Sequence, residues 1–300
     1  MTYDEFGLFH ENAEEWGIPF DAPPVVRREY VEVAPGRRLS ALVWGTDEPE
    51  LVLLHGGAQN AHTWDTVALA LGHPLIAVDL PGHGYSGPRP ESPFAPRAFA
   101  ADVDVVVRAL APNAQVLVGM SLGGATAMVM GAHYPGNFRQ MVLVDATPAF
   151  DPVKAAPIGE FVRGPEHFDS FDEILERTMR FNPTRSESSL RRGVLHNAVE
   201  RPDGTWVWRH QQHWAPPPAG GASEPPPIPD FESLWEDVEH SKIPILLVRG
   251  TAPGTLVDEV GLTGLARRRP DAQVVAVDGA GHSVQGDKPL VLAGILRDLF

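Results

Sequence analysis

A serine between two glycines is the strongest chemical signal in this sequence. The pentapeptide Gly-Met-Ser-Leu-Gly at 119–123 directly follows the apolar run 115–118 and precedes a run of small residues at 124–129. A strand, a tight turn and a helix in this order would hold Ser121 on a strained bend above the end of a sheet. The residues two before and two after the serine must be small, because strand and helix nearly touch there. This context predicts that Ser121 is a nucleophile.

A histidine close to the C-terminus has the position of a general base. His282 follows the apolar run 273–277 in a Gly-Ala-Gly loop, which is flexible enough to bring an imidazole over Ser121. A serine hydroxyl is too weak an acid to ionise near neutral pH, so a histidine must take its proton during attack on a substrate. We therefore expect Ser121 and His282 to act together.

The other histidines have structural interpretations. We expect His55 to brace the loop that follows the apolar run 51–54, and His83 to brace the neighbouring turn. His210 and His213 could suggest a metal site, but no carboxylate or third histidine completes a usual zinc pattern. Both are expected on the surface of an inserted segment, and the sequence predicts neither a metal nor a cofactor.

Charge and composition exclude several classes of protein. The 300 residues carry a formal net charge of −15, which disfavours nucleic-acid binding because phosphate contacts need clustered Lys and Arg. There is no cysteine, so disulfides and thiolate catalysis are excluded. No signal-peptide pattern is visible, and no apolar run is long enough to cross a bilayer. We expect a cytoplasmic protein with a small-molecule substrate and with neither a nucleic-acid nor a membrane partner. The sequence indicates no oligomeric state.

Apolar runs alternate with helical patterns along most of the chain. The runs expected to be strands are 51–54, which should be buried, 75–78, 116–118, 141–144, 245–248 and 273–277. Helices are expected at 63–71, 96–110 and 288–300. Continuous apolar strands are typical of a parallel sheet that is covered on both faces. The alternation therefore predicts an α/β protein with a doubly wound, mostly parallel sheet.

The alternation is interrupted in the middle of the chain. Helical stretches at 170–180 and 186–199 and a proline-rich segment at 215–229 replace the buried strands. Because two strands and His282 come later, the core must close around this segment. We expect three parts: an N-terminal extension at 1–24, a core at 25–148 and 242–300, and a mainly helical cap at 149–241.

Four short motifs occur in order along the chain. They are His-Gly-Gly at 55–57, Asp-Leu-Pro-Gly-His-Gly-Tyr-Ser at 79–86, the pentapeptide at 119–123, and Gly-Ala-Gly-His at 279–282. With this order and spacing the chain resembles the α/β-hydrolase fold superfamily, in particular its small, cap-bearing members. The resemblance covers nearly the whole chain from about residue 28 and implies a serine hydrolase with that fold.

An oxyanion hole needs two backbone N–H groups aimed at the developing negative charge. One is expected from Leu122, which follows the nucleophile at the start of a helix. The resemblance points to Gly57, in the loop after the first buried strand, for the other.

The acid of the catalytic triad has two candidates. Relatives usually carry Asp in a Gly-x-x-Asp arrangement after the next-to-last strand, where this chain has Gly-Thr-Ala-Pro at 250–253. Asp145 ends an apolar strand, which is a rigid position that some family members use. Asp258 could fold back from later in the same loop, or it could cap the helix that follows. We favour Asp145, whose role would be to hold the His282 tautomer and stabilise the imidazolium.

A serine nucleophile implies acyl transfer to water through an acyl-serine intermediate. We expect an ester or lactone of small to medium size and fairly apolar character. Five aromatic residues of the cap could line an apolar pocket or form the cap's own core: Phe161, Phe168, Trp206, Trp208 and Trp214. Carbon–carbon bond hydrolysis and thioester hydrolysis stay open as alternatives, and so does a ligand-binding sensor, because a fold does not fix a function.

Overall fold

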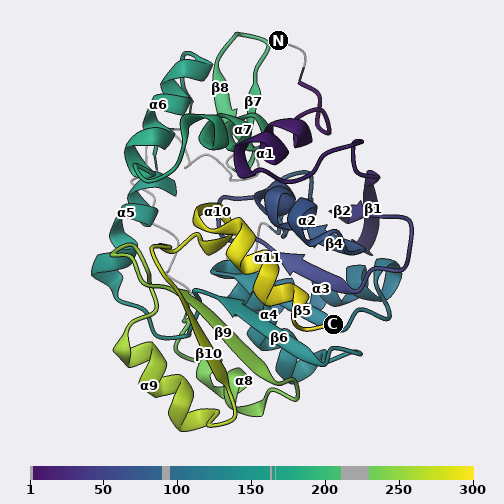
Figure 1. Ribbon diagram of the computed structural model, residues 1–300, viewed down its shortest axis with the longest axis vertical. Coiled ribbons are helices and arrows are strands. Elements are labelled where there is room, and N and C mark those ends of the chain that lie inside the picture. The colour runs from purple at the N-terminus through teal and green to yellow at the C-terminus, as the bar shows by residue number, and fades with distance from the viewer. Residues whose placement is uncertain (1–2, 90–94, 163, 166, 211–229) are drawn as a thin grey trace.

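A central eight-stranded sheet organises the molecule (Figure 1). The computed structural model describes residues 3–89, 95–162, 164–165, 167–210 and 230–300. The strands of this sheet are β1 (Val26–Ala34), β2 (Arg37–Trp44), β3 (Leu51–Leu54), β4 (Leu75–Val78), β5 (Val116–Met120), β6 (Gln140–Val144), β9 (Ile245–Gly250) and β10 (Gln273–Val277). Their order in the sheet is β1-β2-β4-β3-β5-β6-β9-β10. β2 runs antiparallel to β1 and β4, and the remaining neighbours are parallel, so the mostly parallel sheet is confirmed.

Helices cover both faces of the sheet, as expected for a doubly wound fold (Figure 1). One face carries α1 (Phe9–Trp16), α2 (Asp65–Leu71) and α11 (Pro289–Arg297). The other face carries α3 (Pro96–Leu110), α4 (Leu122–His133), α8 (Leu234–His240) and α9 (Glu259–Arg268). Two short elements, η1 (Ala61–Trp64) and α10 (Val284–Asp287), complete this part of the chain. Within the described residues, no helix combines the length and the apolar character needed to span a bilayer.

The central strands are buried on both sides, which explains their continuous apolar runs. All four residues of β3 are fully buried, and so are all four residues of β4. Eleven of the twelve residues of α4 are also buried, because this helix packs against β5, α3 and α8. A helix enclosed in this way has no polar face. Its small and apolar residues let it lie close to the sheet directly behind Ser121.

The segment between β6 and β9 forms a separate small core above the sheet. It contains α5 (Pro152–Val162), α6 (Phe171–Phe181), α7 (Glu187–Asn197), β7 (Ala198–Glu200) and β8 (Trp206–Trp208). Phe168 and Trp208 are buried in this core together with apolar residues of α6 and α7. The segment also includes α8, which packs on α4 rather than with these elements. Trp214 and the proline-rich segment 215–229 lie outside the described residues.

The N-terminal segment docks on the rest of the molecule through α1. Phe9 packs on Trp44 of β2, with ring centroids 4.9 Å apart. On the other side, Glu11 accepts a hydrogen bond of 3.0 Å from Arg191 of α7, and Glu15 forms an ion pair with Arg192. This segment therefore contacts both the sheet region and the inserted helices.

Candidate active site

Ser121 lies on a strained turn between β5 and α4. Its backbone has φ 51° and ψ −115°, in the left-handed region that disfavours side chains. Only glycine fits on either side of the turn, because a side chain there would clash with the backbone. A Cβ on Gly119 would lie 2.3 Å from the Gly123 carbonyl oxygen. A Cβ on Gly123 would lie 2.3 Å from the carbonyl oxygen of Leu54. The chain therefore bends at Ser121 as the sequence predicts.

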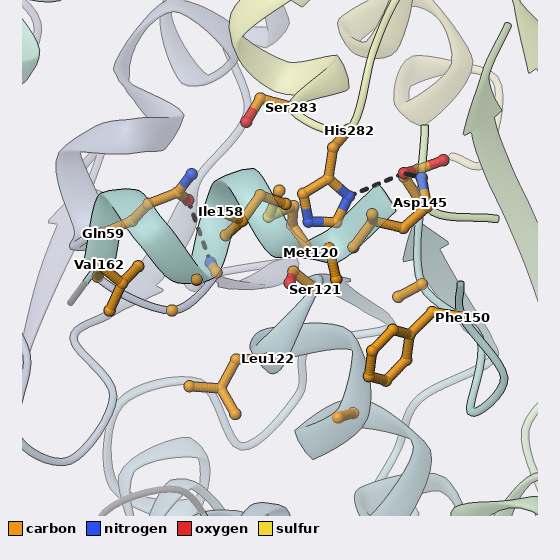
Figure 2. Close-up of a pocket in the computed structure, with 18 of the residues that line it drawn as sticks. Gln59, Met120, Ser121, Leu122, Asp145, Phe150, Ile158, Val162, His282 and Ser283 are labelled. Atoms are coloured by element: carbon orange, nitrogen blue, oxygen red, sulfur yellow. Dashed lines mark hydrogen bonds and ion pairs between the residues drawn. The ribbon is translucent and has the colours of Figure 1, made fainter. Parts of the chain in front are cut away.

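His282 is held by Asp145, which follows the last residue of β6. Nδ1 of His282 lies 2.8 Å from Oδ2 of Asp145 (Figure 2). The carboxylate also accepts hydrogen bonds from the backbone N–H of Leu256 at 2.9 Å and from the N–H of Gly250 at 3.3 Å. The hydroxyl of Thr255 donates to the same carboxylate. An ionised carboxylate can only accept, so Nδ1 of His282 carries a proton and Nε2 is left as the basic nitrogen.

Asp258 has a different role in the structure. It is the N-cap of α9, and its Oδ1 accepts from the backbone N–H groups of Val260 and Gly261, both at 3.0 Å. This is the capping alternative of the sequence analysis. The carboxylate beside His282 is that of Asp145.

The loop after β9 contributes to the site in a way that the sequence analysis missed. The stretch 250–256 supplies the donors that hold Asp145, including Thr255 and Leu256. It also lies directly under the His282 loop, because a Cβ on Gly250 would come within 2.1 Å of the Ala280 carbonyl oxygen. The only signal in the sequence was the Pro253 that replaces the usual acid.

Ser121 and His282 line the same cavity. In Figure 2 the serine lies beneath the histidine ring, and the ring nitrogen that does not face Asp145 is on the serine side. Neither side chain hydrogen-bonds to the other in this structure, although both are described. Catalytic hydrogen bonds are often long before a substrate binds, so this geometry is compatible with proton transfer.

The two residues expected to supply the oxyanion donors, Gly57 and Leu122, are neighbours in space and line the cavity with Ser121. Leu122 is the first residue of α4, so its N–H has no acceptor within the helix. Gly57 lies next to it, because a Cβ there would be 3.9 Å from Leu122 Cδ2. His55 braces this loop: its Nε2 accepts from the Leu80 N–H at 2.9 Å, and its Nδ1 donates to the Gly56 carbonyl oxygen at 2.7 Å.

The cavity above Ser121 has a volume of about 490 Å³ and mostly apolar walls. Phe150 and Phe161 line it, together with Ile158 of α5 and Met128 of α4. Asp145 and His282 are the only ionisable side chains among the described residues of its lining. Of the expected aromatic residues, Phe161 therefore lines this cavity, whereas Phe168, Trp206 and Trp208 belong to the small core of the inserted segment.

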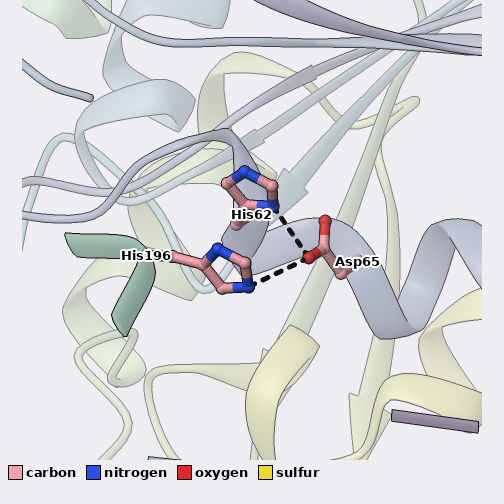
Figure 3. Close-up of side chains that lie close together, drawn as sticks. All are labelled: His62, Asp65 and His196. Atoms are coloured by element: carbon pink, nitrogen blue, oxygen red, sulfur yellow. Dashed lines mark hydrogen bonds and ion pairs between the residues drawn. The ribbon is translucent and has the colours of Figure 1, made fainter. Parts of the chain in front are cut away.

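A cluster of His62, Asp65 and His196 lies where α7 meets η1 and the first residue of α2 (Figure 3). His62 lies 2.9 Å from Asp65, and its ring stacks on that of His196 with centroids 3.8 Å apart and planes 8° apart. Burial alone would lower the pKa of His62, but the Asp65 carboxylate and the hydrogen bonds that His62 donates to Asp65 and Glu5 raise it to about 9. Burial and the charge of His62 hold the pKa of His196 well below its ordinary value.

This pair is therefore a charged ring stacked on a neutral one. A ring nitrogen binds a metal in the plane of its ring, and a single ion cannot lie in both of these parallel planes.

The expected position of His210 was wrong, because its side chain is buried beside Trp208 rather than exposed. His213 lies outside the described residues.

Comparisons with known proteins agree with this architecture. The alpha/beta hydrolase fold family matches residues 49–289. The chain is 41% identical to esterase Rv0045c of Mycobacterium tuberculosis, over 98% of this chain and 95% of that protein. A crystal structure of that esterase has a TM-score of 0.83 at 39% identity, and the match covers 100% of this chain and 98% of that one.

A more distant relative is the 2-(acetamidomethylene)succinate hydrolase of Mesorhizobium japonicum. It is 27% identical over 80% of this chain and 84% of its own length. The family match spans most of the chain, and the mycobacterial relative is similar over almost all of it. On these grounds, together with the sheet order and the turn at Ser121, the chain belongs to the alpha/beta hydrolase fold family.

Proposed function

We propose that this protein is a serine esterase with Ser121 as nucleophile, His282 as general base and Asp145 as the acid of the triad. The observation that carries the proposal is the 2.8 Å contact between His282 and Asp145, made beside Ser121 in a single cavity. The strained turn exposes the serine, and the carboxylate sets the tautomer that leaves Nε2 free to take a proton.

The first half of the reaction forms an acyl-serine. Ser121 Oγ attacks the ester carbonyl carbon while Nε2 of His282 takes the hydroxyl proton. The carbonyl oxygen becomes negative, and the N–H groups of Gly57 and Leu122 donate to it. The C–O bond to the alcohol then breaks, and the imidazolium gives its proton to the leaving alcohol.

The second half releases the acid. Water attacks the acyl-serine carbonyl and gives a proton to His282, and the same two N–H groups bind the oxyanion. Ser121 leaves with the proton from the imidazolium, so the enzyme is regenerated and one water is consumed. No group other than the triad, the two N–H donors and water is needed.

The cavity supports an ester or lactone with an uncharged, fairly apolar body. Its lining offers apolar side chains near the serine, which bind alkyl or aromatic groups by burial. The esterase that is 41% identical to this chain supports ester hydrolysis over carbon–carbon bond or thioester hydrolysis and over a sensor role. We also propose that residues 149–241 act as a cap on a core of 25–148 and 242–300, with 1–24 as the extension.

A short-chain p-nitrophenyl ester assay tests the proposal. The wild-type protein should hydrolyse p-nitrophenyl butyrate, and Ser121→Ala should lower kcat by about a million-fold, as loss of a triad nucleophile does. A fluorophosphonate probe should label the wild type at Ser121 and should not label the variant.

Ser188→Ala serves as the matched control. Ser188 is exposed on α7 and does not line the apolar cavity, so this variant should keep both turnover and labelling. If the wild type shows neither ester turnover nor labelling at Ser121, the protein is not a serine esterase.

A further inference from the structure

A second, smaller cavity adjoins the apolar cavity. It has a volume of about 160 Å³, and amide, hydroxyl and charged side chains line most of it, so we call it the polar cavity. The residues that line both cavities are Ala58, Gln59, Phe161, Asn182 and Ser283. Two of them, Gln59 and Ser283, lie on the left and upper sides of Figure 2. These shared residues therefore form the boundary between the two cavities.

Arg185 brings a positive charge to the polar cavity, and no carboxylate of the described residues lies within ion-pair distance of it. It lies in the turn between α6 and α7, and its Nη2 donates to Ser189 Oγ at 2.7 Å. Its Nε is buried and has no hydrogen-bond partner. A Cβ on Gly286 would lie 2.9 Å from the guanidinium carbon, so Arg185 packs directly on α10, the short helix after His282.

Arg192 also lines the polar cavity, but unlike Arg185 it has a carboxylate partner. Its Nη2 forms an ion pair with Glu15, its Nε donates to Asn12 at 3.1 Å, and its Nη1 donates to Ser188 at 2.7 Å. Among the described residues, the fold thus supplies a direct carboxylate partner for Arg192 and not for Arg185, on which Asp287 and Glu15 act only from a longer distance. An arginine stays protonated in proteins, so Arg185 brings its full positive charge to the polar cavity. A carboxylate of a ligand can therefore pair with Arg185 directly.

Three other buried polar atoms of residues that line the polar cavity also have no hydrogen-bond partner within the described ranges of the chain. They are Oε1 of Gln285, Oδ1 of Asp65 and Nε2 of His196, the last two on residues shown in Figure 3. Buried polar atoms in native proteins are normally satisfied by protein, water or ligand. Because most of the side chains that line it are polar, the polar cavity is suited to a polar group and not to an alkyl chain.

We propose that the polar cavity is a carboxylate subsite, in which Arg185 binds the free carboxylate of a substrate whose ester carbonyl lies at Ser121. The substrate class is then the half-ester of a dicarboxylic acid, with its uncharged chain in the apolar cavity. A guanidinium matches a carboxylate with two parallel N–H···O bonds, and the Arg185 side chain lines the polar cavity. This inference rests on the proposed esterase activity, because it concerns the substrate of the same site.

The test compares charged and neutral substrates of equal length. Methyl half-esters of the dicarboxylic acids from succinic to suberic acid are matched with methyl esters of the corresponding monocarboxylic acids. The wild type should prefer the half-ester at one chain length, because Arg185 and Ser121 are fixed relative to each other. Arg185→Met should lower kcat/KM for that half-ester by about 10- to 100-fold, the loss expected for hydrogen bonds to a charged group.

The neutral esters and two further variants make the result specific. The loss in Arg185→Met should be at least about tenfold larger for the half-ester than for the neutral ester. Arg185→Lys should restore part of the preference, since it keeps the charge without the planar fork. Arg180→Met, which removes an exposed arginine from nearby α6, should leave both activities unchanged.

Two outcomes overturn the subsite. The first is a wild type that shows no half-ester preference at any chain length, which means that water alone fills the polar cavity. The second is an Arg185→Met variant that loses both activities equally. Failure of the esterase proposal looks different, because the neutral p-nitrophenyl ester would then also be left intact and Ser121 unlabelled.

A measurement on the wild type alone covers the case in which Arg185→Met does not fold. Monoamides of the same dicarboxylic acids should inhibit p-nitrophenyl butyrate hydrolysis competitively. At the preferred length they should bind at least about tenfold more tightly than uncharged amides of equal length. Equal inhibition by the two series would also overturn the carboxylate subsite.

Discussion

Backbone strain in this protein is concentrated at the candidate site. In the described part of the chain, three residues other than glycine have positive φ: Ala58 at 59°, Ser121 at 51° and Asp145 at 46°. Ala58 follows the proposed oxyanion residue, and the other two follow adjacent strands, β5 and β6. Such conformations cost on the order of 1–3 kcal/mol each and persist where surrounding structure holds them. The sheet holds two of them, since the Asp145 N–H donates to the Val248 carbonyl oxygen at 2.7 Å and the Ser121 N–H donates to the Val144 carbonyl oxygen at 3.4 Å.

At the scale of single residues, Asp145→Asn decides the assignment of the acid. An amide can donate to Nδ1 of His282 and so favours the wrong tautomer of the ring, while the site keeps its shape. We expect turnover to fall on the order of ten-thousandfold. The measurement is kcat for p-nitrophenyl butyrate with circular dichroism as a check on folding.

Asp258→Asn is the matched control for that substitution. Asn caps a helix about as well as Asp, so this variant should keep its stability within about 0.5 kcal/mol and retain full turnover. A fully active Asp145→Asn protein, or an equal loss in Asp258→Asn, would contradict the assignment of Asp145.

At the scale of elements, local patterns predicted some boundaries and missed others. The helix expected at 96–110 is α3, whose Pro96 starts the helix where a missing N–H does no harm. The helix expected at 186–199 ends at Asn197, because the next three residues pair with β8 as β7. The helix α5 was not predicted from the sequence. It contains Pro157, and a proline inside a segment normally indicates that the segment is not helical.

The docking of the N-terminal segment depends on a buried ionic network. Glu5 accepts from Arg28 Nε at 2.8 Å and lies 3.1 Å from Nε2 of His62. Burial would raise the pKa of Glu5, but the hydrogen bonds from His62 and Arg28 lower it to about 2. Glu5 in turn helps to raise the pKa of His62 to about 9. The proton on His62 therefore stabilises the contact between this segment and the core.

Glu5→Gln should weaken that contact in a pH-dependent way. The folded pKa of His62 is about 9, above its ordinary 6.5, so its contribution to stability is complete below pH 6.5 and is lost as pH rises through 9. We expect the substitution to cost about 1.5–3 kcal/mol at pH 7 and less at pH 10. A residual cost should persist, because Arg28 keeps its charge. Urea unfolding at both pH values measures the difference.

Glu14→Gln provides the comparison for this experiment. Glu14 is exposed on α1, in the same N-terminal segment as Glu5, so its removal should change stability by at most about 0.5 kcal/mol at either pH. A destabilisation by Glu5→Gln that is the same at pH 7 and pH 10 would show that the charge of His62 does not support the docking.

At the scale of the whole molecule, the apolar cavity exists only because distant segments meet. Ile158 and Phe161 come from α5, Leu122 and Met128 from α4, and Val257 from the loop after β9. The inserted segment thus supplies one wall and the sheet region the other. The length of substrate that fits should therefore respond to side chains on α5.

Ile158→Trp should shorten the preferred acyl chain. Ile158 lines the cavity and is 37% exposed, so a larger side chain can fit there while taking space from the substrate. We expect kcat/KM for p-nitrophenyl octanoate to fall about tenfold, whereas that for the acetate should change less than about twofold. Initial rates across a series of chain lengths measure the effect.

Val153→Trp is the control on the same helix. Val153 is 79% exposed and does not line the cavity, so its replacement should leave the chain-length profile as in the wild type. An Ile158→Trp profile identical to the wild type would mean that the acyl chain does not lie against α5.

The sequence by itself determined the sheet and the bend at Ser121, because both follow from short-range requirements. Buried parallel strands need continuous apolar runs, and the tight turn needs glycine at 119 and 123. Tertiary structure alone decided which acid meets His282, since Asp145 lies 137 positions away along the chain. It also decided where Arg185 lies, because an isolated arginine in a turn carries no pattern. Contacts of this kind depend on how far-apart segments pack, and no local periodicity encodes them.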